Sequence, residues 1–233
     1  MQAVPSVFRS PFRKGLAAGF PFIVIIVPFG ALFGVLAAEI GLPIAQIMGF
    51  SVLVIAGASQ FTAVQLMADG VPAVVVVLSA LAVNLRMVMY SAAMVPHLGS
   101  APLWQRAIVS YLLVDQTYAI SAEVFEEEPA WSVADKVAFF AGVAVPVFPG
   151  WVGATWAGAV LGAQVPEGWQ LDFAMPLAFL ALVGPMLKTR AHVAAAFVSV
   201  VAALLFAWVP WNLGLIIAAC LALLTGAEVE RRS

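Results

Sequence analysis

Apolar segments long enough to cross a membrane follow one another along almost the entire chain. Of the 233 residues, 64% are hydrophobic and only 9% are charged, whereas a soluble domain carries about 25% charged residues. A surface with so few charges must face lipid, which excludes a water-soluble enzyme. At roughly 20 residues for each span plus a short loop, eight spans nearly exhaust the length. We therefore expect residues 1–233 to form a single transmembrane domain.

The expected fold is an all-α polytopic membrane protein whose spans are divided by charged and turn residues. The eight expected spans are 16–38, 43–67, 72–95, 104–125, 136–163, 173–187, 192–209 and 211–226. A count of seven stays open because the sixth span is short. The fifth span also contains Pro146 and Pro149, where a helix should break.

The lysine and arginine residues predict a cytoplasmic N-terminus and a cytoplasmic C-terminus, because such residues accumulate on the cytoplasmic side. In this orientation the cytoplasmic segments hold Arg9, Arg13, Lys14, Lys136, Lys188, Arg190, Arg231 and Arg232. Only Arg106 falls on the opposite side, and Arg86 lies within a span.

Two charged residues lie deep within the expected spans. A charge at mid-bilayer costs about 2.5–3.5 kcal/mol on insertion scales, so it usually faces a cavity or a partner. Arg86 shares a helix face with Tyr90, and Asp115 shares one with Tyr111 and Tyr118 by its i, i+4, i+7 spacing. One interpretation is a site where Arg86 binds a carboxylate and Asp115 binds a proton or an ammonium group. The other is an ion pair between the two that only holds the spans together.

A run of small and polar residues, IAGASQFT at 55–62, interrupts the second expected span. One interpretation is close helix packing through small residues. The other is an unwound segment whose polar groups coordinate a substrate. Irregular backbone at this depth is tolerated only where protein or a water-filled cavity covers it, and the binding interpretation is the one we favour.

Prolines inside the expected spans are candidate hinges, because interrupted helices accompany substrate sites in transporters. These candidates are Pro21, Pro28, Pro146 and Pro149. For any single proline, the alternative is a kink that merely shapes the bundle.

A faint internal similarity at an offset of 123 residues suggests a repeat. Gly19 matches Gly142, the pair at 30–31 matches the pair at 153–154, and Pro43 matches Pro166. In an eight-span protein this offset relates spans one and five, which would run in the same direction. Chance similarity between glycine-rich apolar helices is the alternative.

Several function classes have no support in the residues. The net charge of −2 offers no basic surface for nucleic acid. No metal-ligand, nucleotide-binding or catalytic-triad pattern is present, so we expect no metal, no cofactor and no enzymatic activity.

Six motifs distributed along the chain carry a family resemblance. They are GFPF at 19–22 with PFG at 28–30, AGASQF at 56–61, VNLR at 83–86 with YS at 90–91, DQTYA at 115–119, LDFAMPL at 171–177 and PWNLG at 210–214. Together they resemble the AzlC-type branched-chain amino acid permeases, the large subunit of a two-component exporter.

This resemblance implies efflux of leucine, valine, isoleucine and also methionine across a bacterial inner membrane, together with a small AzlD-type membrane subunit. Coupling to the proton gradient is expected, since no ATP motif exists. The family looks to prefer His where this chain has Met87, and Glu where it has Gln116. Because both differences remove a titratable group, Asp115 is the remaining candidate for proton coupling.

The candidate substrate-binding residues lie in spans two, three and four. They are Gly57, Ser59, Gln60, Thr62, Asn84, Arg86, Tyr90, Asp115, Gln116 and Tyr118. Two other functions share the same sequence features and stay open, namely a passive channel for a small polar solute and a structural membrane subunit.

Overall fold

A computed structural model describes residues 11–162, 187, 189–210 and 213–232, and the regular structure of these residues is helical. The chain divides into two compact units, Met1–Trp169 and Gln170–Ser233, and each is described by itself. Among the described residues, the helical segments Pro11–Glu39, Ala73–Leu98, Val133–Gly162 and Leu213–Arg232 are long and apolar enough to cross a membrane. The expected all-α polytopic class is confirmed, whereas the single transmembrane domain stays a prediction.

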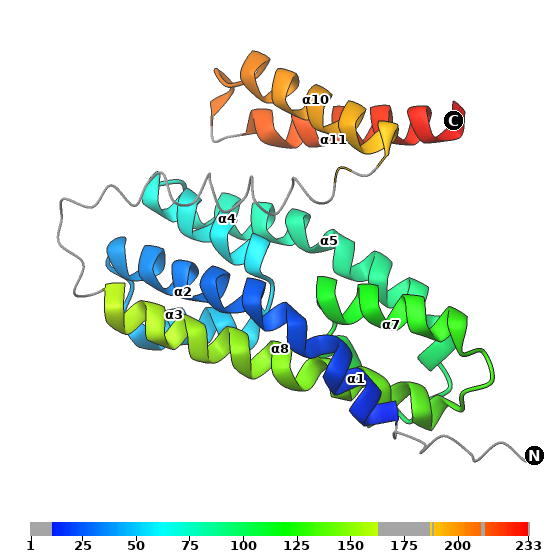
Figure 1. The fold of residues 1–233 in the computed structure, drawn as a ribbon. Coiled ribbons are helices and arrows are strands. Elements are labelled where there is room, and N and C mark those ends of the chain that lie inside the picture. Colours follow the sequence, from blue (N-terminus) through cyan, green and yellow to red (C-terminus); the bar gives the residue numbers. More distant parts are fainter. Residues whose placement is uncertain (1–10, 163–186, 188, 211–212, 233) are drawn as a thin grey trace, which may run out of the picture. The chain divides into compact units, whose positions relative to one another are not determined.

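The first unit is built on two long helical paths that run side by side in the same direction (Figure 1). One path consists of α1 (Pro11–Gly19), the short 3-10 helix η1 (Phe20–Phe22) and α2 (Ile23–Glu39); the other is α8 (Val133–Gly162). We call the two ends of this unit the Lys14 end and the Glu39 end.

Glycines allow the two paths to approach closely. A Cβ atom on Gly15 would overlap the carbonyl of Phe139, and one on Gly158 would overlap the carbonyl of Ala31. Small residues at such positions let helix backbones pack in a membrane. Gly34 faces Gly158, so contacting residues are separated by nearly the offset of the internal similarity. The shared direction of the two helices is confirmed, whereas their origin as a repeat stays a prediction.

The predicted break in the fifth span is wrong, because α8 continues as one helix through Pro146 and Pro149. A proline removes one backbone donor, and in a membrane bundle neighbouring helices compensate for that loss. Pro21 lies in η1 and Pro28 lies inside α2. The hinge role of these four prolines stays a prediction.

The second expected span consists of two short helices, α3 (Ile44–Leu53) and α4 (Gly57–Ala68). The Gln60 amide donates to the Ser51 hydroxyl oxygen at 3.2 Å. In a continuous helix these residues, nine positions apart, would be separated by about 13 Å along the axis. The chain therefore turns back at residues 54–56, and we call α3 and α4 hairpin 1 and this turn tip 1.

Hairpin 1 starts and finishes at the Glu39 end. The ring of Phe33 on α2 contacts both Phe50 on α3 and Phe61 on α4, with centroids 6.4 and 5.6 Å apart. Tip 1 reaches the middle of the unit, where Gly57 lies against Trp151 of α8. α3 packs against α8 and α4 packs against α2, near the final turns of those two helices (Figure 1).

The chain then crosses the whole unit through α5 (Ala73–Leu98). The Ser59 hydroxyl of α4 donates to the Ala80 carbonyl oxygen at 2.9 Å, so α5 leaves the Glu39 end antiparallel to α4. At its far end, His97 lies 3.4 Å from the Lys136 amine near the start of α8. α5 therefore finishes at the Lys14 end.

The fourth expected span is a second hairpin, made of α6 (Leu103–Tyr111) and α7 (Asp115–Glu127). α7 runs from the middle of α5 back to its end, because the Phe125 and His97 rings are 5.5 Å apart. Lys14 then pairs with Glu128 at 3.1 Å. We call α6 and α7 hairpin 2, and the turn at 112–114 tip 2.

The two hairpins thus enter the first unit from opposite ends, and neither crosses it. This arrangement corrects the predicted position of Arg106, which lies at the start of α6 and hence at the Lys14 end. Among the described residues of this unit, that end holds Arg13, Lys14, Arg106 and Lys136, and Arg86 lies midway along α5. The path α1–α2 is followed by hairpin 1, and α5 is followed by hairpin 2. These two helix-and-hairpin pairs run in opposite directions, which is the pattern of an inverted repeat.

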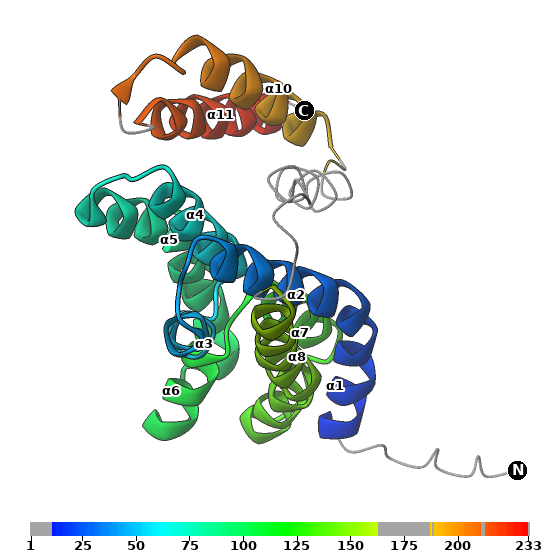
Figure 2. The ribbon, with the colours of Figure 1, turned by 90° about the vertical axis from the view of Figure 1, so that its left-hand side faces the viewer.

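The second unit contains α10 (Arg190–Leu205) and α11 (Leu213–Arg232). The two helices are antiparallel, since Gly226 of α11 faces Ala195 of α10, and they lie side by side in Figure 2. They correspond to the seventh and eighth expected spans. Residues 173–186 of the sixth span lie outside the described residues.

Candidate functional site at the hairpin tips

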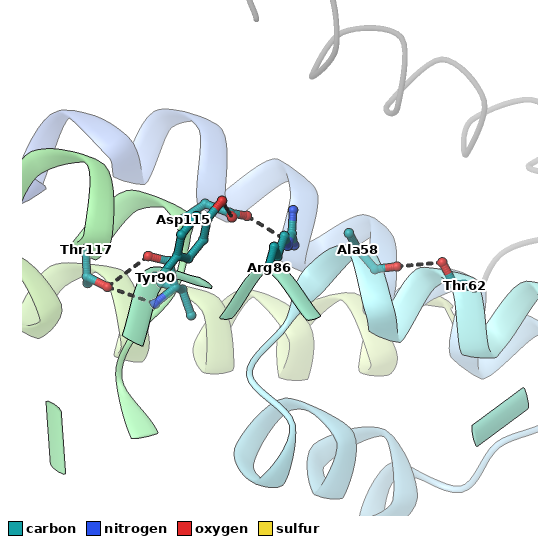
Figure 3. A network of polar contacts seen from close by, with 7 residues as sticks. Ala58, Thr62, Arg86, Tyr90, Asp115 and Thr117 are labelled. Carbon is teal, nitrogen blue, oxygen red and sulfur yellow. Dashed lines mark hydrogen bonds and ion pairs between the residues drawn. The ribbon is translucent and has the colours of Figure 1, made fainter. Parts of the chain in front are cut away.

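Two charged groups near the middle of the first unit form an ion pair. Arg86, at the middle of α5, contacts Asp115, the first residue of α7, through an Nη2–Oδ2 distance of 3.1 Å. The other oxygen of Asp115 accepts a hydrogen bond from the Tyr90 hydroxyl at 3.0 Å. Figure 3 shows Arg86 and Tyr90 both directed at this carboxylate. The ion pair that the sequence left as one of two interpretations is therefore present.

Asp115 is well placed electrostatically. It occupies the first turn of α7, where unpaired backbone N–H groups and the helix dipole favour a negative charge. The ring of Tyr118, one turn further along, stacks on Tyr90 with centroids 4.1 Å apart and an interplanar angle of 10°. This stack holds α5 against α7 beside the ion pair.

The ion pair is partly exposed, and its hydrogen-bonding groups are not all used. The side chains of Arg86 and Asp115 are 30% and 42% exposed, so they line an open face. The Nε of Arg86 and the Oδ1 of Asn84 are buried without a hydrogen-bond partner among the described residues. A guanidinium has five N–H donors, and this one retains capacity for a further acceptor.

The two tips meet near this pair. The Tyr111 hydroxyl at the end of α6 donates to the Val52 carbonyl oxygen at the end of α3, and the Tyr111 ring contacts Phe148 of α8. The predicted common helix face of Tyr111, Asp115 and Tyr118 is wrong, because tip 2 separates Tyr111 from the other two. Their spacing in sequence matched a helix that the structure interrupts.

The remaining candidates of the second span lie on α4, and their polar groups bond mainly to neighbouring helices or to α4 itself. Ser59 bonds to α5, as described above, and Thr62 donates to the Ala58 carbonyl of its own helix at 2.8 Å (Figure 3). Gln60 is buried against α3. Gly57 starts α4 and Gln116 lies half-buried beside Asp115. Their roles in binding stay predictions.

Thr117 is a residue that the sequence reasoning missed. Its hydroxyl oxygen accepts from the Val114 N–H at 2.9 Å, and it lies 2.9 Å from the Leu112 carbonyl oxygen, which can accept in return. Tip 2 is thus closed by a side chain of its own helix. Tip 1 has no such group, because Ala56, the N-cap residue of α4, provides no side-chain cap.

Ser51, Trp151 and Thr155 were missed as well. Ser51 donates to the Thr155 hydroxyl of α8 at 3.0 Å, and both residues are fully buried. Nothing in their sequence spacing connects them, since they lie 104 positions apart. In the sequence, Ser51 and Thr155 are each recognisable only as a single polar residue within an apolar run.

Comparison with known proteins decides the family. The family model described as AzlC protein matches residues 21–165 of the chain. The chain belongs to the AzlC family. An uncharacterized membrane protein of Archaeoglobus fulgidus is 32% identical to this AzlC-family chain over 225 residues, which is 94% of the chain and 96% of that relative. Inner membrane protein YgaZ of Escherichia coli is 25% identical over 187 residues, 76% of this chain and 73% of that protein.

No solved structure matches this AzlC-family protein. The family match covers α2 through α8, and with them both hairpins and the Arg86–Asp115 pair. The AzlC-family chain is therefore a membrane protein whose architecture is consistent with a transporter.

Proposed function

We propose that this protein is a secondary transporter that exports branched-chain amino acids, such as leucine, valine and isoleucine, and also methionine. The observation that carries the proposal is the Arg86–Asp115 pair near the point where the tips of two hairpins meet and helices end inside the unit. Interrupted helices at mid-membrane are a recurrent way to build a transporter site, because their ends offer unpaired backbone groups to a substrate.

The chemistry of the pair suits a zwitterion. The carboxylate of an amino acid would bind Arg86, whose Nε has no partner among the described residues. The ammonium group would bind Asp115, whose oxygens already accept from Arg86 and Tyr90. A zwitterion carries the same two charges as the pair, so it can take the place of the direct contact without leaving a charge unmatched.

The exposure of the pair supports a water-accessible site. Exposing either charge to lipid tails would cost several kcal/mol, yet both side chains are partly exposed in the first unit. Water, substrate or protein must therefore cover this face. In the proposed mechanism, movement of the hairpins opens the pair to each side of the membrane in turn.

We propose that the Lys14 end faces the cytoplasm of a bacterial cell and that this membrane is the inner one. The support is the positive-inside rule, because Arg13, Lys14, Arg106 and Lys136 gather at that end of the unit. The N-terminal side of α1 and the start of hairpin 2 would then be cytoplasmic, and the opening of hairpin 1 would face outward.

The proposed coupling ion is the proton, with Asp115 as its acceptor. Protonation of Asp115 would remove the negative charge that holds Arg86 and the substrate ammonium, so a proton and the substrate would occupy this carboxylate in turn. The proposed partner is a small AzlD-type membrane subunit, which the family resemblance implies.

The test is counterflow in proteoliposomes that contain the purified chain together with its companion subunit. We expect internal leucine or valine to accelerate uptake of the radiolabelled amino acid, and we expect this exchange to saturate. A passive channel would show flux that neither saturates nor responds to internal substrate. A folded complex that exchanges no neutral amino acid would refute the transport proposal and favour a structural subunit.

A further inference from the structure

Behind tip 1 lies a cluster of neutral polar groups that the proposed amino-acid site does not use. Ser51 of α3, Gln60 of α4 and Thr155 of α8 are at most 1% exposed. The Ser51 and Thr155 oxygens are 3.0 Å apart, and the Gln60 amide lies 3.2 Å from the Ser51 oxygen. Three separate helices therefore bring their polar atoms to one buried point.

One acceptor in this cluster has no partner. The Oε1 of Gln60 is buried and makes no hydrogen bond with the described residues, and the same holds for the Nε1 of Trp151. A buried polar atom without a partner costs about 1–3 kcal/mol. Trp151 precedes Thr155 by one helical turn, so both side chains lie on the same face of α8.

The backbone of tip 1 also departs from ordinary geometry. Ile55 has a φ of 44°, a left-handed conformation that a β-branched residue rarely adopts. Such strain costs about 1–3 kcal/mol and clusters at ligand sites and switch regions. At tip 2 the Thr117 hydroxyl bonds to the turn, whereas α4 lacks a side-chain cap at tip 1. The C-terminal end of α3, which carries the negative pole of the helix, points at this uncapped turn.

We propose that Ser51, Gln60 and Thr155 form a binding site for a sodium ion behind tip 1. In transporters, unwound backbone carbonyls and the C-terminal ends of half-helices coordinate Na⁺. Hydroxyl and side-chain amide oxygens offer lone pairs of the same kind. The close spacing of the oxygens suits a small ion. None of the three is a carboxylate, and carboxylates are what Ca²⁺ and Mg²⁺ sites usually contain.

Binding requires only local rotations. Each hydroxyl can turn its hydrogen away and present a lone pair, and the Gln60 amide can rotate to exchange its nitrogen for its oxygen. Since the three ligands come from α3, α4 and α8, the ion would fix hairpin 1 against the long helix.

The site does not rest on the proposed transport function, in which the proton is the coupling ion. The test is therefore binding, measured with radioactive sodium on the purified full-length chain in detergent, with N-methylglucamine as the replacement cation. We expect saturable binding that unlabelled Na⁺ displaces and K⁺ displaces at least tenfold less well. Absence of saturable sodium binding to the folded wild-type chain would overturn the proposal, whatever the transport assay shows.

Variants locate the site. Thr155→Val keeps the shape of the side chain and removes its oxygen, so sodium affinity should fall at least tenfold, whereas Thr155→Ser should retain it. Ser121→Ala is the matched control, because Ser121 is also fully buried but lies in hairpin 2. Equal sodium affinity in the wild-type, Thr155→Val and Ser121→Ala proteins would overturn the assignment. If Thr155→Val does not fold, Ser51→Ala replaces it and the same outcomes apply.

Discussion

The Tyr111 hydroxyl of hairpin 2 donates a hydrogen bond to the Val52 carbonyl oxygen of hairpin 1. This bond joins two segments that enter the unit from opposite ends, and it lies near the Arg86–Asp115 pair that we propose as the substrate site. In the proposed alternating access the hairpins move. The two tips must then either separate, which breaks this bond, or move together.

Removing this bond should loosen the contact between the tips. We expect Tyr111→Phe to lower the free energy of unfolding by about 0.5–1.5 kcal/mol, the usual net value of one hydrogen bond. Thermal unfolding of the purified protein in detergent measures the effect. Tyr118→Phe is the control, because its ring keeps the stack on Tyr90. Equal melting temperatures for wild type and Tyr111→Phe would show that the bond does not hold the tips.

The hairpin arrangement makes a topological prediction that differs from eight crossings. With hairpins, the loop after α4 and the loop after α5 lie at opposite ends of the unit, because only α5 separates them. We expect a cysteine at Ala68 to react with an impermeant thiol reagent from outside the cell, and a cysteine at Ser100 to react only from the cytoplasmic side. Eight full crossings require the reverse for both positions.

The reference for this labelling experiment is a cysteine at Ala130, which both topologies place in the cytoplasm. Ala68, Ser100 and Ala130 are exposed in the first unit. The native Cys220 must first be replaced by serine. Labelling of Ala68→Cys from the same side as Ala130→Cys, with Ser100→Cys labelled from the opposite side, would contradict the hairpin arrangement.

Two glycines of α8 should respond oppositely to the same substitution. A Cβ atom at Gly158 would overlap the Ala31 carbonyl, whereas one at Gly153 meets nothing within 4 Å. We expect Gly158→Ala to destabilise the protein by about 1–3 kcal/mol because the helices must move apart. Gly153→Ala should be neutral or stabilising by up to about 1 kcal/mol, because alanine favours a helix. Thermal unfolding compares the two, and equal effects would argue against the close packing of α2 on α8.

Charge reversal separates a structural ion pair from a binding site. Asp115→Asn should lower stability by about 1.5–3 kcal/mol, the value of a hydrogen bond to a charged group, and should reduce leucine exchange at least 100-fold. The double variant Arg86→Asp with Asp115→Arg should recover part of the stability but no exchange, since an arginine at the start of α7 opposes the helix dipole. Exchange restored in the double variant would show that the pair is only structural.

The sequence was sufficient to single out the charged part of the candidate site. In a chain with few charges, Arg86 and Asp115 stood out as the two deep ones, and Arg86 and Tyr90 share a helix face because helical periodicity is local. The structure confirms that Arg86 and Tyr90 share a face and that Arg86 pairs with Asp115, since Tyr90 and Arg86 contact the two oxygens of this carboxylate. A carboxylate and a guanidinium at this depth need each other, so their contact follows from the cost of an unpaired charge.

The sequence alone did not show that the second and fourth expected spans turn back. An apolar stretch of 25 residues has the same composition whether it crosses a membrane or forms a hairpin of two half-length helices. Neither tip 1 nor tip 2 contains a proline or glycine that marks a turn within 54–56 or 112–114, whereas α8 contains two prolines and stays helical. Proline rules describe an isolated helix, and tertiary packing overrides them here.

By itself, the sequence determined that this protein lies in a membrane, that it is helical and that two opposite charges share its interior. These properties depend on composition and on spacing within one helix. Tertiary structure decided that two spans are hairpins, that their tips meet at Tyr111 and Val52, and that Ser51, Gln60 and Thr155 converge behind one of them. Those relationships join residues as many as 104 positions apart, and only the packing of the α2–α8 pair brings them together.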